Sequence, residues 1–367
     1  MLKVCYFTSK KSSDVRVFEK ECSSLVNAGY EVYLLSPNAK DEVKNGVHIL
    51  GFPFKPKGLL QRNFSLPKLI YKKALSIDAD IYHFNDPSCL HYASKLKLRG
   101  KKVIFDCFED HPLLLFEKKY IPYPLLYLIS KVYTAYEYYY SKKFDGIISC
   151  YHWTHERLKK ACKNNELIFN FPVLKGLENK IDNNSKPSIC YAGLISKMWK
   201  IENIIGALIN LEDIQFNLAG HGDITYIENM KKSEGWKKVN FIGSIERDDV
   251  HRSIYAKSKI GMVLLDYIPL CKGNVGNLSN NKFFEYMMAG LPIICTDFIL
   301  WKEIVEVNNC GICVNPNNIT EITEAIKYLI ENPKIAKEMG DNGRKAIEKK
   351  YNWNVEEKKL LSIYNSI

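Results

Sequence analysis

The sequence predicts an α/β protein with two Rossmann-like domains, each built on a parallel sheet. Short apolar runs alternate with helical segments along almost the whole chain, which is the pattern of parallel strands joined by crossover helices. A polar stretch interrupts this alternation near the middle, and the last segment is helical with no further strand. The 367 residues, of which 46% are hydrophobic, are enough for two domains rather than one.

The first half begins with a strand and continues as alternating strands and helices. The strands are expected at residues 3–8, 31–36, 47–51, 81–84, 102–106, 146–149 and 166–170. The helices are expected at residues 17–28, 87–98, 122–141 and 154–161. This order predicts a first α/β domain over residues 1–174.

The stretch KGLENKIDNNSKPS, residues 175–188, is polar and has no hydrophobic period. Its composition is typical of a boundary between domains, so we expect a linker at residues 175–187.

The alternation then restarts and predicts a second domain over residues 188–350. Its strands are expected at residues 188–192, 214–219, 239–242, 260–264, 292–296 and 311–314. Its helices are expected at residues 201–211, 224–233, 248–257, 282–289 and 319–331. The helical end, residues 333–367, is expected to send a last helix, residues 351–367, back to the first domain. We expect the two sheets to face each other, with the ligand site between them at the carboxyl ends of their strands.

The net charge of +11 lies almost entirely in the first half, where residues 1–170 hold 27 Lys and Arg against 17 Asp and Glu. Such an excess indicates an anionic partner: membrane lipid, a phosphate-bearing acceptor or nucleic acid. The alternative is a basic surface that only keeps the protein in solution. No nucleic-acid-binding motif can be read, so nucleic acid is not expected as a partner.

The cysteines indicate a reducing compartment. They are scattered, and several fall in apolar runs, such as Cys5, Cys190 and Cys295, which is typical of small buried side chains. Cys310 and Cys313 form a lone C-x-x-C, so no metal site is expected there. The sequence shows neither a membrane-spanning apolar stretch nor a signal peptide, and we therefore expect the protein in the cytoplasm.

Several common enzyme classes lack their motifs. The loop after the first strand, TSKKSSDVRVFEKE, is not G-x-G-x-x-G, and neither a Walker A sequence nor G-x-S-x-G occurs. The sequence therefore gives no support for a nicotinamide enzyme, a P-loop NTPase or an α/β-hydrolase.

Carboxylates follow two strands of the first domain. Asp86 comes after one strand, and Glu109 and Asp110 come after the next. Their position at carboxyl strand ends suits hydroxyl recognition or general-base catalysis. The alternative for Asp86 is helix capping, because Pro87 follows it.

Lysines and glycines follow two strands of the second domain. Lys197 and Lys200 precede a helix that begins near Ile201, which suits phosphate binding, although solvated surface lysines are the alternative. Gly220 and Gly222 follow the next strand, where glycines would let a nucleotide base approach the backbone.

The stretch NLSNNKFFEYMMAGLPIICTD, residues 277–297, is expected to be a helix, a sharp stop at Gly290 and a buried strand. Ser279 or Asn280 can cap the helix. Asn281, Lys282 and Glu285 share one side of it. The free N–H groups and Lys282 would favour a phosphate, and Glu285 could accept hydrogen bonds from a ribose diol. The alternative is that Lys282 and Glu285 pair with each other.

These blocks resemble glycosyltransferase family 4. The segments that carry the resemblance, in chain order, are VRVFEKECSSLVNAGYEVYLLSP, DIYHFNDPSCL, KKVIFDCFEDHP, YAGLISK, FNLAGHGD, VNFIGSIERDDVHRSIYAKSKIGMVLL, NKFFEYMMAGLPIICTD and EKKYNW. The resemblance implies the GT-B fold of two Rossmann-like domains. It also implies a retaining transfer from a nucleotide sugar to a hydroxyl acceptor, without a metal or other cofactor.

The resemblance also implies roles for residues of the second domain. Glu285 would bind the ribose. The backbone N–H groups of Leu278, Ser279 and Asn280 would bind the diphosphate, together with Lys200 or, alternatively, Lys197. The first domain would hold the acceptor, which is expected to be a glycan or a lipid-linked molecule of surface polysaccharide biosynthesis.

Several positions depart from the family pattern. Asn277 stands where a sugar-contacting glutamate is expected, Leu194 where an arginine is frequent, and Phe108 where relatives have a histidine. Residues 85–88 read N-D-P-S where close relatives usually read H-D-P-E. Two alternatives stay open. One is a nucleotide-sugar 2-epimerase, which shares the GT-B architecture, and the other is a non-catalytic homologue that binds a sugar or a partner, which the missing glutamate and histidine allow.

The segment YIPYPLLYLISKVYTAYEYYYSKKF is an aromatic helix within the basic first domain. It suits contact with an anionic membrane surface, which would place the protein peripherally on the inner face of a membrane. The alternative is a core helix whose apolar face is buried.

Overall fold

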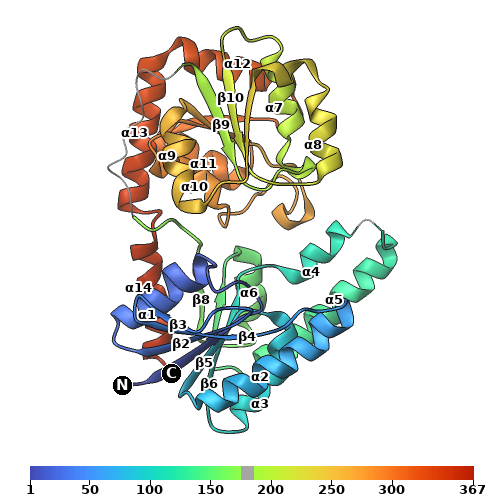
Figure 1. The fold of residues 1–367 in the computed structure, drawn as a ribbon, viewed down its shortest axis with the longest axis vertical. Helices are drawn as coiled ribbons and strands as arrows, with labels where there is room; N and C mark the ends of the chain where they lie inside the picture. The colour runs from blue at the N-terminus through green and yellow to red at the C-terminus, as the bar shows by residue number, and fades with distance from the viewer. Residues whose placement is uncertain (119, 175–185) are drawn as a thin grey trace. The chain divides into compact units, whose positions relative to one another are not determined.

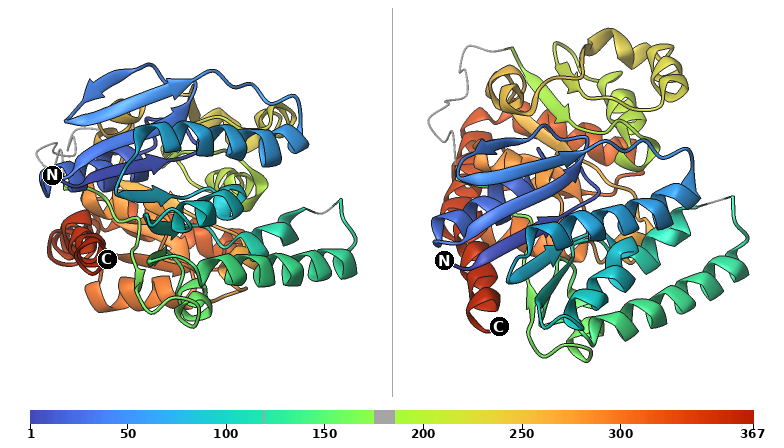
Figure 2. Two further views of the ribbon diagram at one scale, coloured as in Figure 1. Left: turned by 90° about the horizontal axis from the view of Figure 1, so that it is seen from below. Right: turned by 60° about the horizontal axis from the view of Figure 1, so that its bottom comes forward.

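The computed structural model describes residues 1–118, 120–174 and 186–367, drawn as ribbons in Figures 1 and 2. They form two compact units, Met1–Asn170 with Trp353–Ile367, and Phe171–Asn352. The predicted linker lies outside the described residues apart from Lys186 and Pro187.

The first unit is built on an eight-stranded sheet with the order β3-β4-β2-β1-β5-β6-β7-β8. Its strands are β1 (Lys3–Phe7), β2 (Glu31–Pro37), β3 (Glu42–Lys44), β4 (Val47–Phe52), β5 (Ile81–Phe84), β6 (Lys102–Cys107), β7 (Gly146–Ser149) and β8 (Asn165–Leu167). All neighbours pair in parallel except β3 and β4, which pair antiparallel. The edge strand β3 was not predicted, because its three residues are all exposed and show no apolar alternation.

Helices cover this sheet and include one that comes from the far end of the chain. They are η1 (Arg16–Cys22), α1 (Ser23–Asn27), η2 (Gln61–Ser65), α2 (Leu66–Ile77), η3 (Pro87–Cys89), α3 (Leu90–Lys97), α4 (His111–Leu114), η4 (Leu115–Glu117), α5 (Tyr123–Ser141), α6 (His152–Lys159) and α14 (Trp353–Asn365). Hydrogen bonds from both ends of α14 hold it in this unit: Trp353 Nε1 donates to Ser24 Oγ, and Tyr364 Oη lies 2.9 Å from His83 Nδ1.

The second unit is a six-stranded sheet of parallel strands with the order β11-β10-β9-β12-β13-β14. The strands are β9 (Ser188–Ala192), β10 (Gln215–Ala219), β11 (Val239–Gly243), β12 (Ile260–Val263), β13 (Ile293–Thr296) and β14 (Gly311–Val314). The helices are η5 (Lys197–Trp199), α7 (Ile201–Leu208), α8 (Ile224–Lys231), η6 (Glu234–Lys238), α9 (Arg247–Ser253), η7 (Tyr255–Lys257), η8 (Pro269–Cys271), α10 (Asn281–Met288), α11 (Ile299–Asn308), α12 (Ile319–Glu331) and α13 (Pro333–Lys349).

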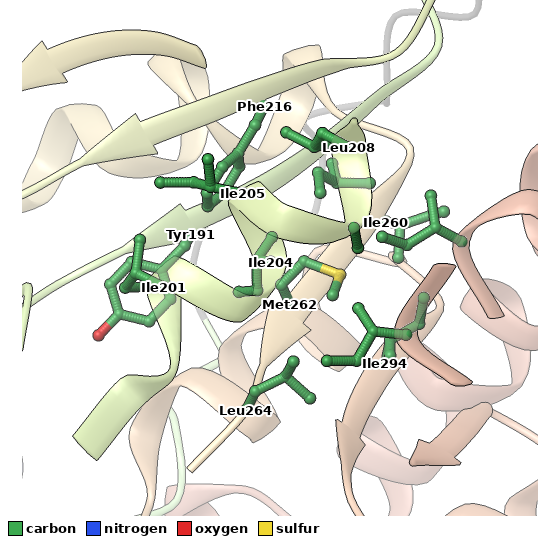
Figure 3. Close-up of a cluster of buried hydrophobic side chains, with 14 of the residues drawn as sticks. Tyr191, Ile201, Ile204, Ile205, Leu208, Phe216, Ile260, Met262, Leu264 and Ile294 are labelled. Carbon is green, nitrogen blue, oxygen red and sulfur yellow. The ribbon is translucent and has the colours of Figure 1, made fainter. Parts of the chain in front are cut away.

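The core of this unit shows why α7 forms where it does. Its apolar residues Ile201, Ile204, Ile205 and Leu208 recur at helical spacing and are buried against the sheet. Figure 3 shows them with residues of β9, β10, β12 and β13, including Tyr191, Phe216, Met262 and Ile294. Burying each such side chain contributes roughly 1.5–3 kcal/mol.

In both sheets the order in which the chain adds strands reverses between two central strands, and ligands bind beside such a point in α/β sheets. In the second unit β9 and β12 are neighbours, and the chain proceeds outward from this pair on both sides. In the first unit the corresponding pair is β1 and β5. The loops after two such strands diverge and leave room for a ligand at the carboxyl ends.

Candidate active site

Two segments meet at the carboxyl ends of β9 and β12. The first is the loop from Gly193 to Lys200, and the second leads from β12 to α10. They are tied together by two contacts, because Asp266 N–H donates to Met198 O at 2.8 Å and Lys200 Nζ lies 2.8 Å from Asp266 Oδ2. This ion pair lowers the pKa of the Asp266 carboxyl against the effect of its burial.

Lys200 and Lys197 therefore differ in their surroundings. Lys200 stands before α7 with a left-handed backbone, φ +46°, and its ammonium is engaged by Asp266. Lys197 is exposed, and within the described residues it forms no ion pair. A phosphate would find Lys197 available, whereas Lys200 would have to leave or share its carboxylate.

Glu285 lies on α10 with both carboxylate oxygens facing protein groups. Arg247 Nη2, on α9, lies 2.6 Å from Oε1, and Tyr255 Oη donates to Oε2 at 3.1 Å. The alternative in which Glu285 pairs with Lys282 is wrong, because these two groups from another part of the chain take that place. Arg247 is 52% exposed, so a ligand could replace it without opening the core.

Lys282 is held by aromatic rings. Its Nζ lies 3.9 Å from the centre of the Trp199 ring and 5.3 Å from that of Tyr191. Its stem passes Gly193 so closely that a Cβ there would lie 2.3 Å from Lys282 Cε. Burial lowers the pKa of Lys282 to about 8, with Glu285 acting in the opposite direction. No carboxylate within the described residues forms an ion pair with this ammonium.

The start of α10 supplies further polar groups. Asn280 caps the helix, since its Oδ1 accepts from Lys282 N–H at 3.1 Å. Asn281 Oδ1 and Ser196 Oγ are buried, and neither has a hydrogen-bond partner among the described residues. Because an uncompensated buried polar atom is costly, both indicate a ligand at this edge. Ser196 was not singled out from the sequence, where a serine before a lysine carries no distinctive signal.

Asn277 shapes the loop before the helix. Its Oδ1 accepts from Ser279 N–H at 3.1 Å, its Nδ2 lies 3.3 Å from Cys271 Sγ, and its carbonyl accepts from Trp301 Nε1 at 2.6 Å. This buried side chain is thus engaged by the protein at the position where the family resemblance implies a sugar-contacting glutamate. Leu278 and Ser279 complete the loop between Asn277 and the cap.

Gly220 and Gly222 allow two backbones to approach each other. A Cβ at Gly220 would lie 1.8 Å from Gly193 O, and a Cβ at Gly222 would lie 1.9 Å from Ile195 O. Both glycines are therefore required by the packing of the loop after β10 against the loop after β9. The sequence-based expectation named approach of a base, but the structure supplies a protein contact that already explains them.

Two of the three carboxylates predicted in the first unit have structural partners. Asp86 caps η3, accepting from Ser88 N–H at 2.8 Å and from Ser88 Oγ at 2.6 Å. Asp110 caps α4 and is buried, where it accepts from Thr154 Oγ1 at 2.7 Å and pairs with Arg157 at 3.2 Å. Glu109 is half-buried, and its carboxylate makes no ion pair or hydrogen bond within the described residues.

A second group of polar atoms follows the neighbouring strands β5 and β6, as Glu109 does. His111 Nε2 and Asn85 Nδ2 are buried, and the described residues offer them no hydrogen-bond partner. Burial lowers the pKa of His111, against the opposing charges of Glu109 and Asp86. Lys10 Nζ lies 3.6 Å from the centre of the Phe108 ring, where relatives are expected to carry a histidine. A neutral histidine and a carboxylate side by side can bind sugar hydroxyls.

One buried cluster could be mistaken for a metal site. Glu21, His83 and Asp106 place ligand atoms close together, the one such group found in the described part of the chain. However, Arg16 Nε lies 3.0 Å from Glu21 Oε1 and 2.9 Å from Asp106 Oδ2. The guanidinium thus supplies the positive charge, and the cluster is a buried ion-pair network.

Replacing Asp110 by alanine is expected to destabilise the protein by roughly 2–4 kcal/mol, because a helix cap and charged hydrogen bonds are lost. Glu109→Ala serves as the matched control and should change the free energy of unfolding by less than about 1 kcal/mol. Urea unfolding of both variants measures this. An Asp110→Ala variant as stable as the wild type would restore Asp110 as a candidate for chemistry.

The chain resembles known glycosyltransferases in sequence. Residues 177–346 match the family described as glycosyl transferases group 1, and residues 15–170 match glycosyltransferase family 4. An uncharacterised glycosyltransferase of Methanocaldococcus jannaschii is 26% identical over 198 residues, which are 53% of this chain and 48% of that protein. The chain spans about half the length of the curated relatives it matches.

Solved structures agree with the chain in fold. Sucrose-phosphate synthase of Thermosynechococcus elongatus has a TM-score of 0.76 at 14% identity, covering 100% of this chain and 98% of that one. An Anabaena protein solved in complex with UDP-glucose has a TM-score of 0.71 at 12% identity, with 100% of both chains covered. The predicted GT-B fold class is confirmed.

Proposed function

This chain belongs to glycosyltransferase family 4, and from that premise we propose that it transfers a sugar from a nucleotide-sugar donor to a hydroxyl of a glycan or lipid-linked acceptor. Transfer proceeds with retention of the anomeric configuration and serves the synthesis of a surface polysaccharide. A lipid-linked acceptor would bring the enzyme to the cytoplasmic face of a membrane. The 2-epimerase and the non-catalytic homologue remain as alternatives.

The observation that carries the proposal is the side of α10 that faces the β9 loop. It combines a cationic Lys282 held on Trp199, the capped start of a helix, and the carboxylate of Glu285 one turn further on. A diphosphate requires positive charge and N–H donors, and a ribose requires an acceptor for its two hydroxyls. Lys282 and the helix start would face the diphosphate, and Glu285, one turn further along α10, would face the adjoining ribose.

In the proposed complex, Lys282 and the N–H groups of Leu278 and Asn280 bind the diphosphate, and the Ser279 N–H joins them by leaving or sharing Asn277 Oδ1. Lys197 supplies a second charge from the β9 loop, with Lys200 as the alternative. The exposed Arg247 leaves Glu285, and the ribose hydroxyls take its place, while Tyr255 continues to hold the carboxylate. Asn281 and Ser196 gain the partners that their buried oxygen atoms lack. Because the diphosphate charge is met by these groups, the proposed reaction needs no metal ion.

The first unit is proposed to hold the acceptor at the carboxyl ends of β5 and β6. Glu109, His111 and Asn85 offer polar atoms without protein partners, so they are the groups assigned to acceptor hydroxyls. Asp86 and Asp110 position the two loops that carry them. Of the three carboxylates predicted to recognise hydroxyls or act as a general base, the proposal therefore keeps Glu109.

A thermal-shift screen tests the proposal. A bound ligand raises the melting temperature, by an amount that grows with the ratio of ligand concentration to Kd. We expect a nucleoside diphosphate and its sugar conjugates to stabilise the full chain, and the free sugar to leave it unchanged. A panel of UDP-, GDP- and ADP-sugars that produces no shift at millimolar concentration would contradict the proposal.

A further inference from the structure

Helix α5 exposes an apolar stripe. Its exposed apolar residues recur at a spacing of three or four, so they share one face. They are Leu125, Leu128, Ile129, Val132, Tyr136 and Tyr139, which we call the α5 stripe. Val132 is 62% exposed and Leu128 59%, so the described part of the chain leaves this face largely uncovered.

The opposite face of α5 is buried and is mostly polar, with Leu126 as its apolar member. Ser130 Oγ donates to Pro112 O at 3.1 Å, and Glu137 pairs with Arg157 inside the unit. A surface helix usually buries its apolar side, whereas α5 exposes most of its apolar residues. The alternative of a core helix with its apolar face inside is therefore wrong. Large exposed apolar faces mark contact with a partner or a membrane.

The charges around the stripe are positive. Lys131, Lys142 and Lys143 are exposed, and each lies over a tyrosine ring of the same helix at 4.1–5.2 Å from its centre. Glu137 is the one acidic residue between positions 123 and 143, and it is buried. The exposed surface of α5 thus offers apolar and aromatic groups flanked by lysines and no negative charge.

A second segment of the first unit also combines exposed apolar side chains with an excess of positive charge. Leu59, Leu60 and Phe64 are exposed at the start of η2 and α2. Residues 43–77 include seven Lys and Arg and no Asp or Glu. Helix α3 contacts both α2 and α5, and Figure 1 shows these three helices side by side. The segment therefore belongs to the same layer of helices as the stripe.

We propose that the α5 stripe is a docking surface for an anionic lipid bilayer. Leucine, valine and tyrosine side chains enter the boundary between head groups and acyl chains, where aromatic residues are favoured. The flanking lysines keep their ammonium groups among the lipid phosphates, because their stems can lie along the apolar surface. The charge of this face selects an anionic membrane over a second copy of the same positive surface. This docking adds to the proposed function the surface by which the enzyme reaches a membrane, but it does not itself depend on sugar transfer.

Sedimentation with vesicles tests the docking surface. We expect the full chain to bind vesicles of phosphatidylcholine with phosphatidylglycerol at low salt, and to bind less at moderate salt. The double variant Leu128→Gln with Val132→Gln should lower the bound fraction per lipid about tenfold. Val307→Gln is the matched control, because Val307 is 79% exposed on α11 of the other unit, and it should bind as the wild type does.

Three results would overturn the proposal. They are equal binding to vesicles of phosphatidylcholine alone, unchanged binding by the double variant, and a wild-type dimer that becomes a monomer in the double variant. The last would assign the stripe to a second copy of the chain. Binding of UDP should be unchanged in the double variant, so failure of docking can be told apart from failure of the proposed transfer.

Discussion

Replacing Glu285 by glutamine is expected to weaken the binding of UDP about tenfold to a hundredfold. Hydrogen bonds to a charged group contribute roughly 1.5–3 kcal/mol, and the proposed ribose contact uses the carboxylate as acceptor. Glutamine has the same shape and can still accept from Tyr255 Oη, so the fold should be kept. Isothermal titration with UDP and GDP measures the change, with unfolding midpoints recorded for both proteins.

The matched control for this variant is Glu303→Gln. Glu303 is exposed on α11, and the same change of charge there should leave the affinity within about twofold. Arg247→Ala gives a second check, because removing the group that competes for Glu285 should not weaken binding. Equal affinities in Glu285→Gln and wild type, with a wild type that does bind, would remove Glu285 from the site.

Replacing Lys282 by methionine is expected to cause the larger loss in nucleotide-sugar binding, because a charged contact to the diphosphate disappears. We expect a decrease of roughly a hundredfold, at the upper end for a single charged hydrogen bond. The free energy of unfolding, in contrast, should not decrease. Burial lowers the pKa of Lys282 to about 8, which means that the charged form is disfavoured in the folded chain. The methionine variant should therefore be at least as stable at neutral pH.

The lowered pKa of Lys282 sets the pH dependence of both the nucleotide-sugar affinity and the folding stability. In the free protein Lys282 loses its proton as the pH rises through about 8, and a bound diphosphate would hold that proton more strongly. The affinity for a nucleotide sugar should therefore be highest below this pH and should decrease above it. In the unfolded chain the proton stays on until about 10.5. The destabilising effect of Lys282 is thus fully present below about pH 8 and is lost as the pH rises towards about 10.5.

Titration calorimetry and urea unfolding from pH 6.5 to 9.5 measure these trends, with Lys302→Met as the control for a lost exposed lysine. The nucleotide sugar is the suitable ligand, because its esterified diphosphate keeps its charge in this range. A Lys282→Met variant that binds as tightly as the wild type, or that shows the same decrease with pH, would contradict the role given to Lys282.

The alternation of strands and helices in the sequence was sufficient to predict the two parallel sheets, because buried parallel strands are short, apolar and separated by crossovers. The order of the strands was not readable from the pattern alone. Helix α11 was missed although Trp301, Ile304 and Val305 are buried at helical spacing. Their helical spacing indicates a helix, but α11 begins only a few residues after β13, so the apolar pattern of the two elements runs together.

The candidate site shows where sequence reasoning reaches its limit. Glu285 and Lys282 could be found because they share a turn of one helix. Their partners could not, since Arg247 and Trp199 come from other elements and are brought near only by the fold. Asp110 was predicted to take part in acceptor recognition or catalysis. Its partner Arg157 lies 47 residues further along the chain, so the sequence does not show that the two residues pair.

Helix α5 illustrates a different limit. Its composition was consistent with either a core helix or a membrane-contacting helix, since an apolar stripe has the same period in both. The structure shows which side faces inward, because Glu137 pairs with Arg157 inside the unit and Ser130 donates to Pro112 O. Contacts with residues distant in the sequence thus orient the helix and leave most of its apolar residues exposed.

The most direct test of the account is the release of nucleoside diphosphate from a panel of nucleotide sugars by the full chain, with EDTA present. We expect the wild type to release nucleoside diphosphate from at least one donor, by slow hydrolysis or by transfer to an added glycan. We also expect Glu285→Gln to abolish most of this activity and Glu303→Gln to retain it. A folded wild type that binds a nucleotide sugar and releases no nucleoside diphosphate would contradict the account.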